Sequence, residues 1–442
     1  MQRKLNYLLI PILLVLGYLI LMFKLPKYSG QYVFMVLLFL ADLYLWSSVR
    51  KQVFSYRKWL KLTVTFIYWL PLILVIGLMV ASVFVPIIDW NDQFRTFLLG
   101  FILVFYAAKI LPVVFLFLAD IVRVIDKVFI LFRKEERKKI EEKEGITRSK
   151  FLQYLGFISG GLVLGTMFTG MFKWVYQFKV YNQKIKLAKL PEGFEGMKIV
   201  QISDLHLGSW NLTEPLEQAV SMINDTDPDL ILFTGDLVNF STKEAFRFEE
   251  TLSKLKAKNG VYAVLGNHDY GDYVTWPNKT AKEKNLDDLF KFFERVGWKP
   301  LRNENEVFET ESGKLALIGV ENWGASPRFP KYGDIDLAMK GTEDADVRLL
   351  MTHDPSHWGD IIIPDNYEID LSMSGHTHGF QFGIETPGVK WSPAQWMYKQ
   401  WAGLYQDERT GRYLYVNRGL GVIGYPGRIG ILPEITVFEL VS

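Results

Sequence analysis

Five of the six histidines in this chain stand in short clusters with aspartate, asparagine and glycine. The clusters, together with one Gly-Asp pair, are Asp204-Leu205-His206, Gly235-Asp236, Gly266-Asn267-His268-Asp269, Thr352-His353-Asp354 and Gly375-His376-Thr377-His378. Imidazole nitrogens and carboxylate or amide oxygens together bind divalent cations such as Mn, Zn or Fe. The pattern indicates a hydrolytic site with two such ions about 3.5–4 Å apart, which activate water and neutralise phosphoryl oxygens.

Each of the clusters follows an apolar run that is typical of a buried β-strand. The runs are 198–202, 230–233, 261–265, 347–351 and 369–373. Loops at the carboxyl ends of buried strands commonly carry functional residues.

Helical patterns lie between these runs, and further strand patterns follow them. The helical patterns are 214–226, 243–257 and 284–296, and the later strand patterns are 314–320, 412–417 and 434–440. Residues 181–442 are therefore predicted to form an α/β domain, with two mixed sheets packed as a sandwich and flanked by helices.

The N-terminal part of the chain has the composition of a membrane region. A chain of 442 residues with 49% hydrophobic and 15% aromatic residues is too apolar for an ordinary soluble enzyme. The apolar runs are 6–23, 31–48, 62–88, 96–119 and 151–172, and about 20 residues suffice to cross a bilayer. The predicted organisation is an all-α four-helix transmembrane region (1–132), a charged linker (133–150), and a fifth transmembrane helix with its connector (151–180).

The charges in the loops predict an orientation for a multi-pass protein in the lipid bilayer. Lysine and arginine are concentrated at the N-terminus, in residues 50–61 and in the linker, so these parts are expected to be cytoplasmic. Five spans then place the catalytic domain outside the cytoplasm, whereas a fifth run lying on the membrane surface would place it inside. A net charge of only +2 gives no indication of a nucleic-acid partner.

Three ionisable residues, Asp42, Lys109 and Asp120, lie in or at the ends of the apolar runs. An ionisable group at membrane depth is a reason to consider a transport or sensing role. The alternative is a side chain that faces a neighbouring helix or extends to the interface. Both interpretations remain open at the level of sequence.

The motif series as a whole resembles the calcineurin-like metallophosphoesterase superfamily. Asp-x-His, Gly-Asp, Gly-Asn-His-Asp, His and Gly-His-x-His occur complete and in order within residues 195–440, and the preceding spans resemble the transmembrane metallophosphoesterases. The resemblance implies a ligand set: Asp204, His206 and His378 for one metal, Asn267, His353 and His376 for the other, and Asp236 bridging both. It also implies that His268 binds the phosphoryl group or protonates the leaving oxygen, oriented by a carboxylate such as Asp269.

Three further residues bear on the site. Purple acid phosphatases have a tyrosine three positions after the bridging aspartate, where this chain has Asn239, so a purple ferric site is not expected. Arg418 is a candidate to bind the phosphate of the substrate, with a surface ion pair as the alternative. His357 is either an ordinary residue at the start of a helix or a contact to the substrate.

The segment 391–405 is rich in tryptophan and tyrosine. Such residues favour the membrane interface, where they could hold a lipid-linked substrate, but core packing of a long insertion explains the same residues and is the favoured interpretation. The predicted function is that of a membrane-anchored, dinuclear metal-dependent phosphoesterase, acting through a metal-bridging hydroxide on a lipid or envelope-associated phosphodiester or phosphomonoester. The alternative is a non-catalytic membrane sensor or transport-associated protein with a metal-binding domain.

Overall fold

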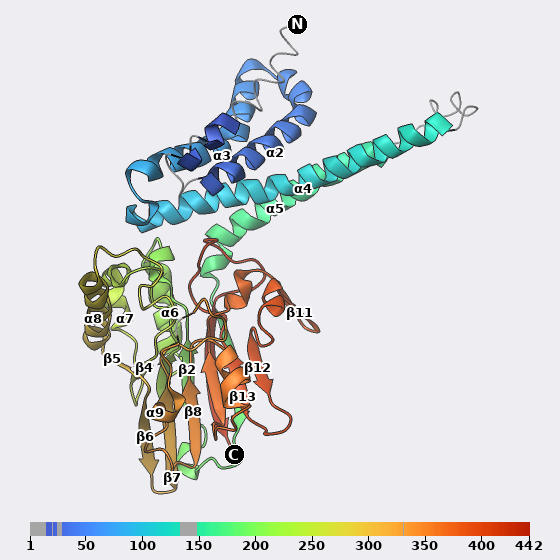
Figure 1. Ribbon diagram of the computed structural model, residues 1–442. Coiled ribbons are helices and arrows are strands. Elements are labelled where there is room, and N and C mark those ends of the chain that lie inside the picture. The colour runs from blue at the N-terminus through green and yellow to red at the C-terminus, as the bar shows by residue number, and fades with distance from the viewer. Residues whose placement is uncertain (1–14, 20, 24–28, 133–147, 330) are drawn as a thin grey trace. The chain divides into compact units, whose positions relative to one another are not determined.

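The computed structural model describes residues 15–19, 21–23, 29–132, 148–329 and 331–442 (Figure 1). The chain divides into two compact units. One consists of residues 1–90 and 97–166, and the other of residues 91–96 and 167–442. The first predicted membrane run, 6–23, lies largely outside the described residues.

The N-terminal region is helical. Its long helices are α2 (Ser29–Phe54), α3 (Lys58–Phe84), α4 (Asp92–Phe132) and α5 (Arg148–Phe172). Within the described residues, these four are long and apolar enough to cross a membrane. Pro71 in α3 and Pro112 in α4 are compatible with membrane helices. The prediction of an all-α membrane region is confirmed, and α4 continues well past the predicted end at residue 119.

The ionisable residues of this region are paired across helices. Asp42 in α2 is 1% exposed, and the Nζ atom of Lys109 in α4 lies 2.6 Å from its Oδ1 atom. The hydroxyl of Tyr106 donates a hydrogen bond of 2.9 Å to the other carboxylate oxygen. Asp120 accepts a hydrogen bond from Tyr44 of α2. These contacts favour the interpretation that the charged groups face neighbouring helices.

Replacing one member of this pair is expected to destabilise the membrane region. In Lys109→Met, the Asp42 carboxylate remains buried without its cation, and breaking a buried pair in this way costs about 3–5 kcal/mol. The double variant Asp42→Asn/Lys109→Met removes both charges and should recover most of the loss. Thermal unfolding of the full chain in detergent measures both effects. Equal midpoints for the wild type and Lys109→Met would contradict the prediction.

The C-terminal unit contains two six-stranded sheets (Figure 1). The first has the order β1 (Lys179–Lys186), β14 (Glu434–Val441), β2 (Lys198–Ile202), β3 (Leu230–Phe233), β4 (Val261–Ala263), β5 (Trp298–Pro300). The second has the order β12 (Gly403–Gln406), β13 (Tyr413–Val416), β9 (Leu371–Ser374), β8 (Val347–Met351), β7 (Gly313–Gly319), β6 (Glu304–Thr310). Both are mixed: β14 is antiparallel to β2 while β2 to β5 run parallel, and β6 is antiparallel to β7 while β7, β8, β9 and β13 run parallel.

The hydrophobic core lies between the sheets and under the helices. Side chains such as Leu232 of β3 and Leu349 of β8 belong to one buried cluster that joins the two inner faces. The helices α6 (Glu214–Asn224), α7 (Glu249–Leu252) and α8 (Lys279–Val296) cover the outer face of the first sheet. On the second sheet, α9 (Ile335–Ala338) and the π-helix Trp358–Ile362 take the equivalent place. The predicted sandwich with flanking helices is confirmed.

The helix predicted over 243–257 is interrupted. Two 3-10 turns, Thr242–Glu244 and Phe246–Phe248, precede the single turn of α7. The carboxylate of Glu244 accepts backbone N–H groups of Asn239 and Ser241, so the start of the segment is held by the loop that follows β3. This local hydrogen bonding competes with a continuous helix.

Candidate metal centre

The predicted ligands follow the carboxyl ends of five strands. Asp204 comes after β2, Asp236 after β3 and Asn267 after β4 in one sheet, and His353 follows β8 and His376 follows β9 in the other. Because carboxyl ends of adjacent parallel strands lie at one edge of a sheet, each sheet presents its ligands on adjacent loops. The two packed sheets bring both sets together.

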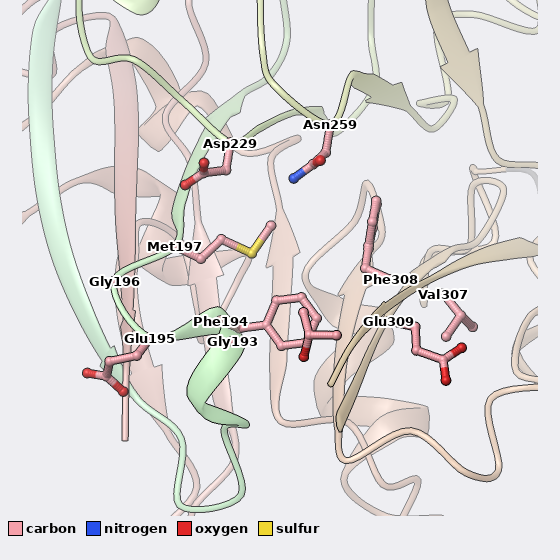
Figure 2. A pocket seen from close by; sticks show the side chains of 11 residues that line it. Gly193, Phe194, Glu195, Gly196, Met197, Asp229, Asn259, Val307, Phe308 and Glu309 are labelled. Carbon is pink, nitrogen blue, oxygen red and sulfur yellow. The ribbon is translucent and has the colours of Figure 1, made fainter. Parts of the chain in front are cut away.

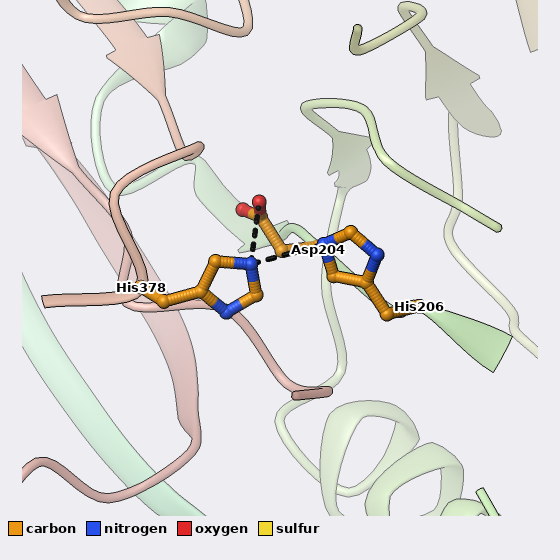
Figure 3. A group of neighbouring side chains, drawn as sticks. All are labelled: Asp204, His206 and His378. Atoms are coloured by element: carbon orange, nitrogen blue, oxygen red, sulfur yellow. Dashed lines mark hydrogen bonds and ion pairs between the residues drawn. The ribbon is translucent and has the colours of Figure 1, made fainter. Parts of the chain in front are cut away.

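Asp204, His206 and His378 form the first cluster, and all three are buried (Figure 3). The Nε2 atom of His378 lies 3.2 Å from Oδ1 of Asp204 and 3.0 Å from Nε2 of His206. Two imidazole nitrogens and one carboxylate oxygen therefore converge on a small volume.

The second cluster contains Asp236, His353 and His376. The Nε2 atom of His353 lies 3.2 Å from Oδ2 of Asp236 and 3.2 Å from Nδ1 of His376. The same Asp236 oxygen lies 3.6 Å from Nε2 of His206 in the first cluster. Asp236 thus joins the two clusters, at the position expected of a bridging carboxylate.

For His353 and His206, a hydrogen-bond acceptor on the side of the ring that faces away from the cluster fixes the tautomer. The Nδ1–H of His353 donates to the backbone carbonyl of Thr234 at 2.7 Å, and Nδ1 of His206 lies 3.1 Å from Oδ1 of Asn239. Since these oxygens can only accept, each Nε2 atom presents its lone pair to the cluster. Burial also lowers the pKa of His206 well below its usual range, which keeps the ring neutral. For His353, burial lowers the pKa, but the facing carboxylates of Asp236 and Asp204 outweigh this and raise it to about 10, so a cation bound here would take the place of the His353 proton.

Asn267 supplies an independent test of whether metal ions fit. Its Oδ1 atom is buried and has no hydrogen-bond partner within the described residues, while its Nδ2 donates to the hydroxyl of Tyr273 at 2.8 Å. An unsatisfied buried oxygen is costly, and a cation beside His353 and His376 would satisfy it. The residues therefore fit a pair of divalent cations.

The ligand loops have an unusual backbone conformation. Left-handed φ angles occur at Asp204 (51°), His206 (44°), Asp236 (60°), His376 (71°) and His378 (51°). This region is unfavourable for residues other than glycine and is occupied mainly where the surrounding structure imposes it. The five angles direct short loops so that side chains from separate strands meet.

The motif glycines allow the carboxylates to approach the neighbouring backbone. A Cβ atom on Gly266 would lie 2.2 Å from Oδ1 of Asp236, and one on Gly375 would lie 2.2 Å from Oδ2 of Asp204. No side chain can occupy those positions without displacing a predicted ligand. This explains why glycine precedes Asn267 and His376 in the motifs.

The role predicted for Asp269 as the group that orients His268 is wrong. The Asp269 carboxylate accepts backbone N–H groups of Asp236 (2.9 Å), Leu237 (2.8 Å) and Gly266 (2.9 Å), so it binds the two ligand loops to each other. The Nδ1–H of His268 donates instead to the backbone carbonyl of Asn239 at 2.7 Å. The difference arises because a buried carboxylate is best satisfied by the nearby row of backbone N–H groups.

The structure does not bring His357 or Arg418 into the clusters. His357 is buried, immediately precedes the π-helix, and places Nδ1 3.1 Å from Oγ1 of Thr352. Arg418 is buried and ion-paired with Glu434 and Glu385. Among the described contacts, neither side chain has a hydrogen bond or ion pair with a predicted ligand. Their roles in substrate binding stay predictions.

The buried His357 is expected to destabilise the fold at acidic pH. Burial lowers its pKa to about 4, so between pH 4 and about 6.5 the unfolded chain binds a proton that the folded chain does not. Stability therefore rises with pH across this window, by on the order of 3 kcal/mol. In His357→Gln the rise should be smaller, as measured by thermal unfolding of the chelator-treated full chain from pH 4.5 to 7. The same pH dependence in both proteins would contradict this.

Several residues beside the second cluster were not predicted. The hydroxyl of Tyr398 lies 2.8 Å from Nε2 of His376, Oδ2 of Asp354 lies 3.5 Å from the same atom, and the Phe329 ring meets the His376 ring edge-on. These residues also line a cavity of about 650 Å³ that contains Arg328. Asp354 follows His353 in the sequence, and this could have indicated that it lies beside the site. The position of Tyr398 relative to the motifs gave no such indication.

A second cavity, of about 490 Å³, lies at the opposite ends of the strands (Figure 2). Its lining includes Asp229 and Met197, which immediately precede β3 and β2. The Asp229 carboxylate accepts the backbone N–H of Lys198 at 2.7 Å. This cavity is therefore separate from the metal centre.

Comparison with known families agrees with this arrangement. Residues 197–380 match the calcineurin-like phosphoesterase model, and this range contains all the predicted metal ligands. Residues 27–174 match a model described as "Probable Calcineurin-like phosphoesterase, transmembrane domain".

Several curated relatives are named as metallophosphoesterases. An uncharacterised metallophosphoesterase of Bacillus subtilis, YkuE, is 29% identical over 302 residues, which cover 66% of this chain and 97% of the relative. A transmembrane protein with a metallophosphoesterase domain from Danio rerio is 31% identical over 267 residues, covering 58% of this chain and 56% of the relative. Among solved structures, phosphopantetheinyl hydrolase of Mycobacterium tuberculosis matches with 14% identity and a TM-score of 0.32, covering 53% of this chain and 91% of that chain.

Proposed function

We propose that this chain, which matches the calcineurin-like phosphoesterase model over residues 197–380 and the transmembrane-domain model over residues 27–174, hydrolyses phosphoester bonds at a two-cation site. The observation that supports the proposal most directly is the pair of three-residue clusters joined by Asp236. The buried, unpartnered Oδ1 of Asn267 is a further oxygen that could bind a cation.

The ligands divide between two positions in this proposal. Asp204, His206 and His378 hold one cation, Asn267, His353 and His376 hold the other, and Asp236 serves both. When bound, the cations supply Lewis acidity and lower the pKa of a water molecule. The mixed nitrogen and oxygen donors suit Mn, Zn or ferrous Fe.

His268 is the residue proposed to act on the substrate itself. Its backbone N–H donates to Oδ1 of Asp236 at 2.8 Å, its Nδ1–H donates to the Asn239 carbonyl, and its ring lies 5.0 Å from that of His206. Nε2 is thus the nitrogen left to exchange a proton. Through Nε2 the ring can hydrogen-bond a phosphoryl oxygen or transfer a proton to the leaving oxygen.

The substrate is proposed to be a phosphomonoester or phosphodiester of a lipid or of the cell envelope. The membrane domain keeps the site near such molecules, and the cavity beside His376 provides room for the organic part of the substrate. Arg328 in that cavity is exposed and, within the described part of the chain, has no recorded ion pair. It is therefore better placed than the buried Arg418 to bind an anionic group.

Arg328→Ala is expected to raise the KM for an anionic phosphoester about tenfold or more, because a charge-assisted hydrogen bond contributes about 1.5–3 kcal/mol. The value of kcat should change much less. A matched control is Arg409→Ala in the same cavity, since Arg409 is already paired with Asp407. Steady-state kinetics of both variants decides the matter: equal KM values for Arg328→Ala and wild type would remove Arg328 from the substrate site.

Hydrolysis by the full chain in detergent tests the proposed function. The protein is stripped with a chelator and reconstituted with Mn, Zn or ferrous Fe, and then assayed on bis-p-nitrophenyl phosphate and p-nitrophenyl phosphate. Activity that returns with a metal supports the proposal, and the ratio of the two rates separates diesterase from monoesterase action. If two ions bind per chain and neither these esters nor a lipid phosphoester is hydrolysed, the proposal fails, and the non-catalytic sensor alternative gains support.

A further inference from the structure

An exposed apolar surface follows the last metal motif. It consists of Phe380 (54% exposed), Phe382 (43%), Ile384 (52%), Val389 (52%), Trp396 (74%) and Met397 (65%), and is called the apolar face below. Single exposed apolar residues are ordinary, but a continuous group of them on a soluble domain marks an interaction surface.

The apolar face is one surface rather than six separate side chains. Phe380 lies on the turn His378–Gln381, and Phe382 follows that turn. Ile384 and Val389 lie on the hairpin of β10 (Ile384–Thr386) and β11 (Val389–Trp391). Trp396 ends the 3-10 turn Pro393–Trp396, and Met397 follows it. The Trp391 ring connects them, since it lies 6.0 Å from the ring of Phe382 and 6.0 Å from that of Trp396. Ile384 also pairs with Trp391 across the hairpin.

The apolar face is joined to residues 425–429, which contact the last turns of the membrane helix α5. The hydroxyl of Tyr425 donates to the carbonyl of Met167 in the last turns of α5, and the backbone N–H of Arg428 donates to the carbonyl of Gly170. The next residue, Ile429, bridges to Phe382 of the apolar face. These contacts all lie within the C-terminal unit.

The approach of α5 to this segment is close. A Cβ atom on Gly170 would lie 2.6 Å from the Tyr425 hydroxyl oxygen and 2.7 Å from the Arg428 carbonyl oxygen, so only glycine permits the contact. The last turns of α5, a helix long and apolar enough to span a bilayer, therefore lie against the residues that bridge to the apolar face.

The apolar face is also continuous with the metal centre. Phe380 is two residues beyond His378, and Met397 precedes Tyr398, whose hydroxyl lies 2.8 Å from Nε2 of His376. Met397 and Tyr398 both line the cavity beside His376. A molecule held at the apolar face would therefore be adjacent to the predicted ligands.

We propose that the apolar face inserts into the boundary between the headgroups and the acyl chains of the bilayer, and that the phosphoester cleaved at the metal centre is the headgroup of a lipid embedded there. The second part rests on the proposed function. Tryptophan and other large apolar side chains beside a membrane helix favour this depth of the bilayer. Segment 391–405 divides between the two explanations, because Trp401, Tyr398 and Tyr405 pack in core clusters, whereas Trp396 and Met397 are exposed.

The absence of cysteine from the chain makes the first part directly testable. Single cysteines at Val389 and Met397, and a control at Glu311 in the exposed β6–β7 turn, are labelled with an environment-sensitive fluorophore. The full chain is placed in nanodiscs of phosphatidylcholine and phosphatidylglycerol. Labels at 389 and 397 should be quenched several-fold more by a lipid-borne nitroxide than by aqueous iodide, and the label at 311 should show the reverse.

Two outcomes would overturn the insertion. Quenching of the 389 and 397 labels by iodide alone would mean that the apolar face remains in water. Protection from both quenchers would mean that protein covers it, either a second copy or other helices of this chain. Neither readout requires hydrolysis, so the result is independent of whether the proposed function holds.

The lipid substrate is tested by a ratio of rates. In Val389→Asp, hydrolysis of phosphatidic acid in the nanodisc should fall about fivefold or more relative to hydrolysis of p-nitrophenyl phosphate, because a charge opposes insertion. An unchanged ratio would overturn the lipid assignment. Absence of all hydrolysis in the wild-type protein would instead overturn the proposed function, with the insertion still decided by the labels.

Discussion

Asp236→Asn is expected to reduce phosphoesterase activity by about 10³-fold or more. The Asp236 carboxylate lies close to imidazole nitrogens of both clusters, at 3.2 Å from Nε2 of His353 and 3.6 Å from Nε2 of His206. Loss of its charge weakens both cation positions together, and Lewis-acid stabilisation is worth several kcal/mol, with each 1.36 kcal/mol equal to a factor of ten in rate. Metal content per chain, measured by elemental analysis, should fall from two towards zero or one.

A matched control separates this effect from loss of folding. The Asp346 carboxylate also accepts a hydrogen bond from a backbone N–H, that of Lys314 at 2.8 Å. Asp346, however, lies immediately before β8 and next to β7 in the second sheet. Asp346→Asn should retain two metals and most activity. Retention of both metals and full activity in Asp236→Asn would refute a bridging role.

His268→Gln is expected to lower kcat by about 10²–10⁴-fold, the range for loss of a general acid, while the metal content stays at the wild-type value. The glutamine amide can still donate a hydrogen bond towards the Asn239 carbonyl but cannot deliver a proton at the Nε2 position. Kinetics and elemental analysis on the same preparations provide both readouts. A loss of metal that parallels the loss of activity would assign His268 to the ligands instead.

The leaving group distinguishes proton donation from simple binding of the phosphoryl group. A p-nitrophenolate ion leaves without protonation, whereas an alkoxide needs a proton. The defect of His268→Gln should therefore be larger on an alkyl phosphate than on p-nitrophenyl phosphate. Equal defects on both would indicate that His268 only hydrogen-bonds the phosphoryl oxygens.

The strands that carry the motifs could be predicted closely from the sequence. The bounds of β2, β3 and β8 coincide with the apolar runs that precede Asp204, Gly235-Asp236 and His353. Buried parallel strands are uniformly apolar and end sharply at polar loops, so both the run and its end are visible. The strand pattern predicted that the motifs meet at one end of the sheets, whereas the division of the histidines between two clusters was implied by the resemblance to the metallophosphoesterases.

Other features depend on contacts that sequence spacing does not encode. Asp269 bonds to backbone groups of two loops, Tyr398 reaches His376 from an insertion, and Glu244 breaks the helix predicted over 243–257. Each follows from where a buried polar group finds its partner in three dimensions. The edge strand β1 was missed because its alternating polar pattern, Lys179–Lys186, overlaps the predicted connector.

The left-handed backbone at five predicted ligands links metal supply to the lifetime of the protein. Each such residue costs about 1 kcal/mol or more, which the folded domain must offset. Bound cations add their binding free energy to the folded state alone, so they set how often the ligand loops open. A copy that receives no metal would therefore open these loops more often and be degraded sooner. Cellular abundance of this protein would then track the availability of its cations, even without any change in its synthesis.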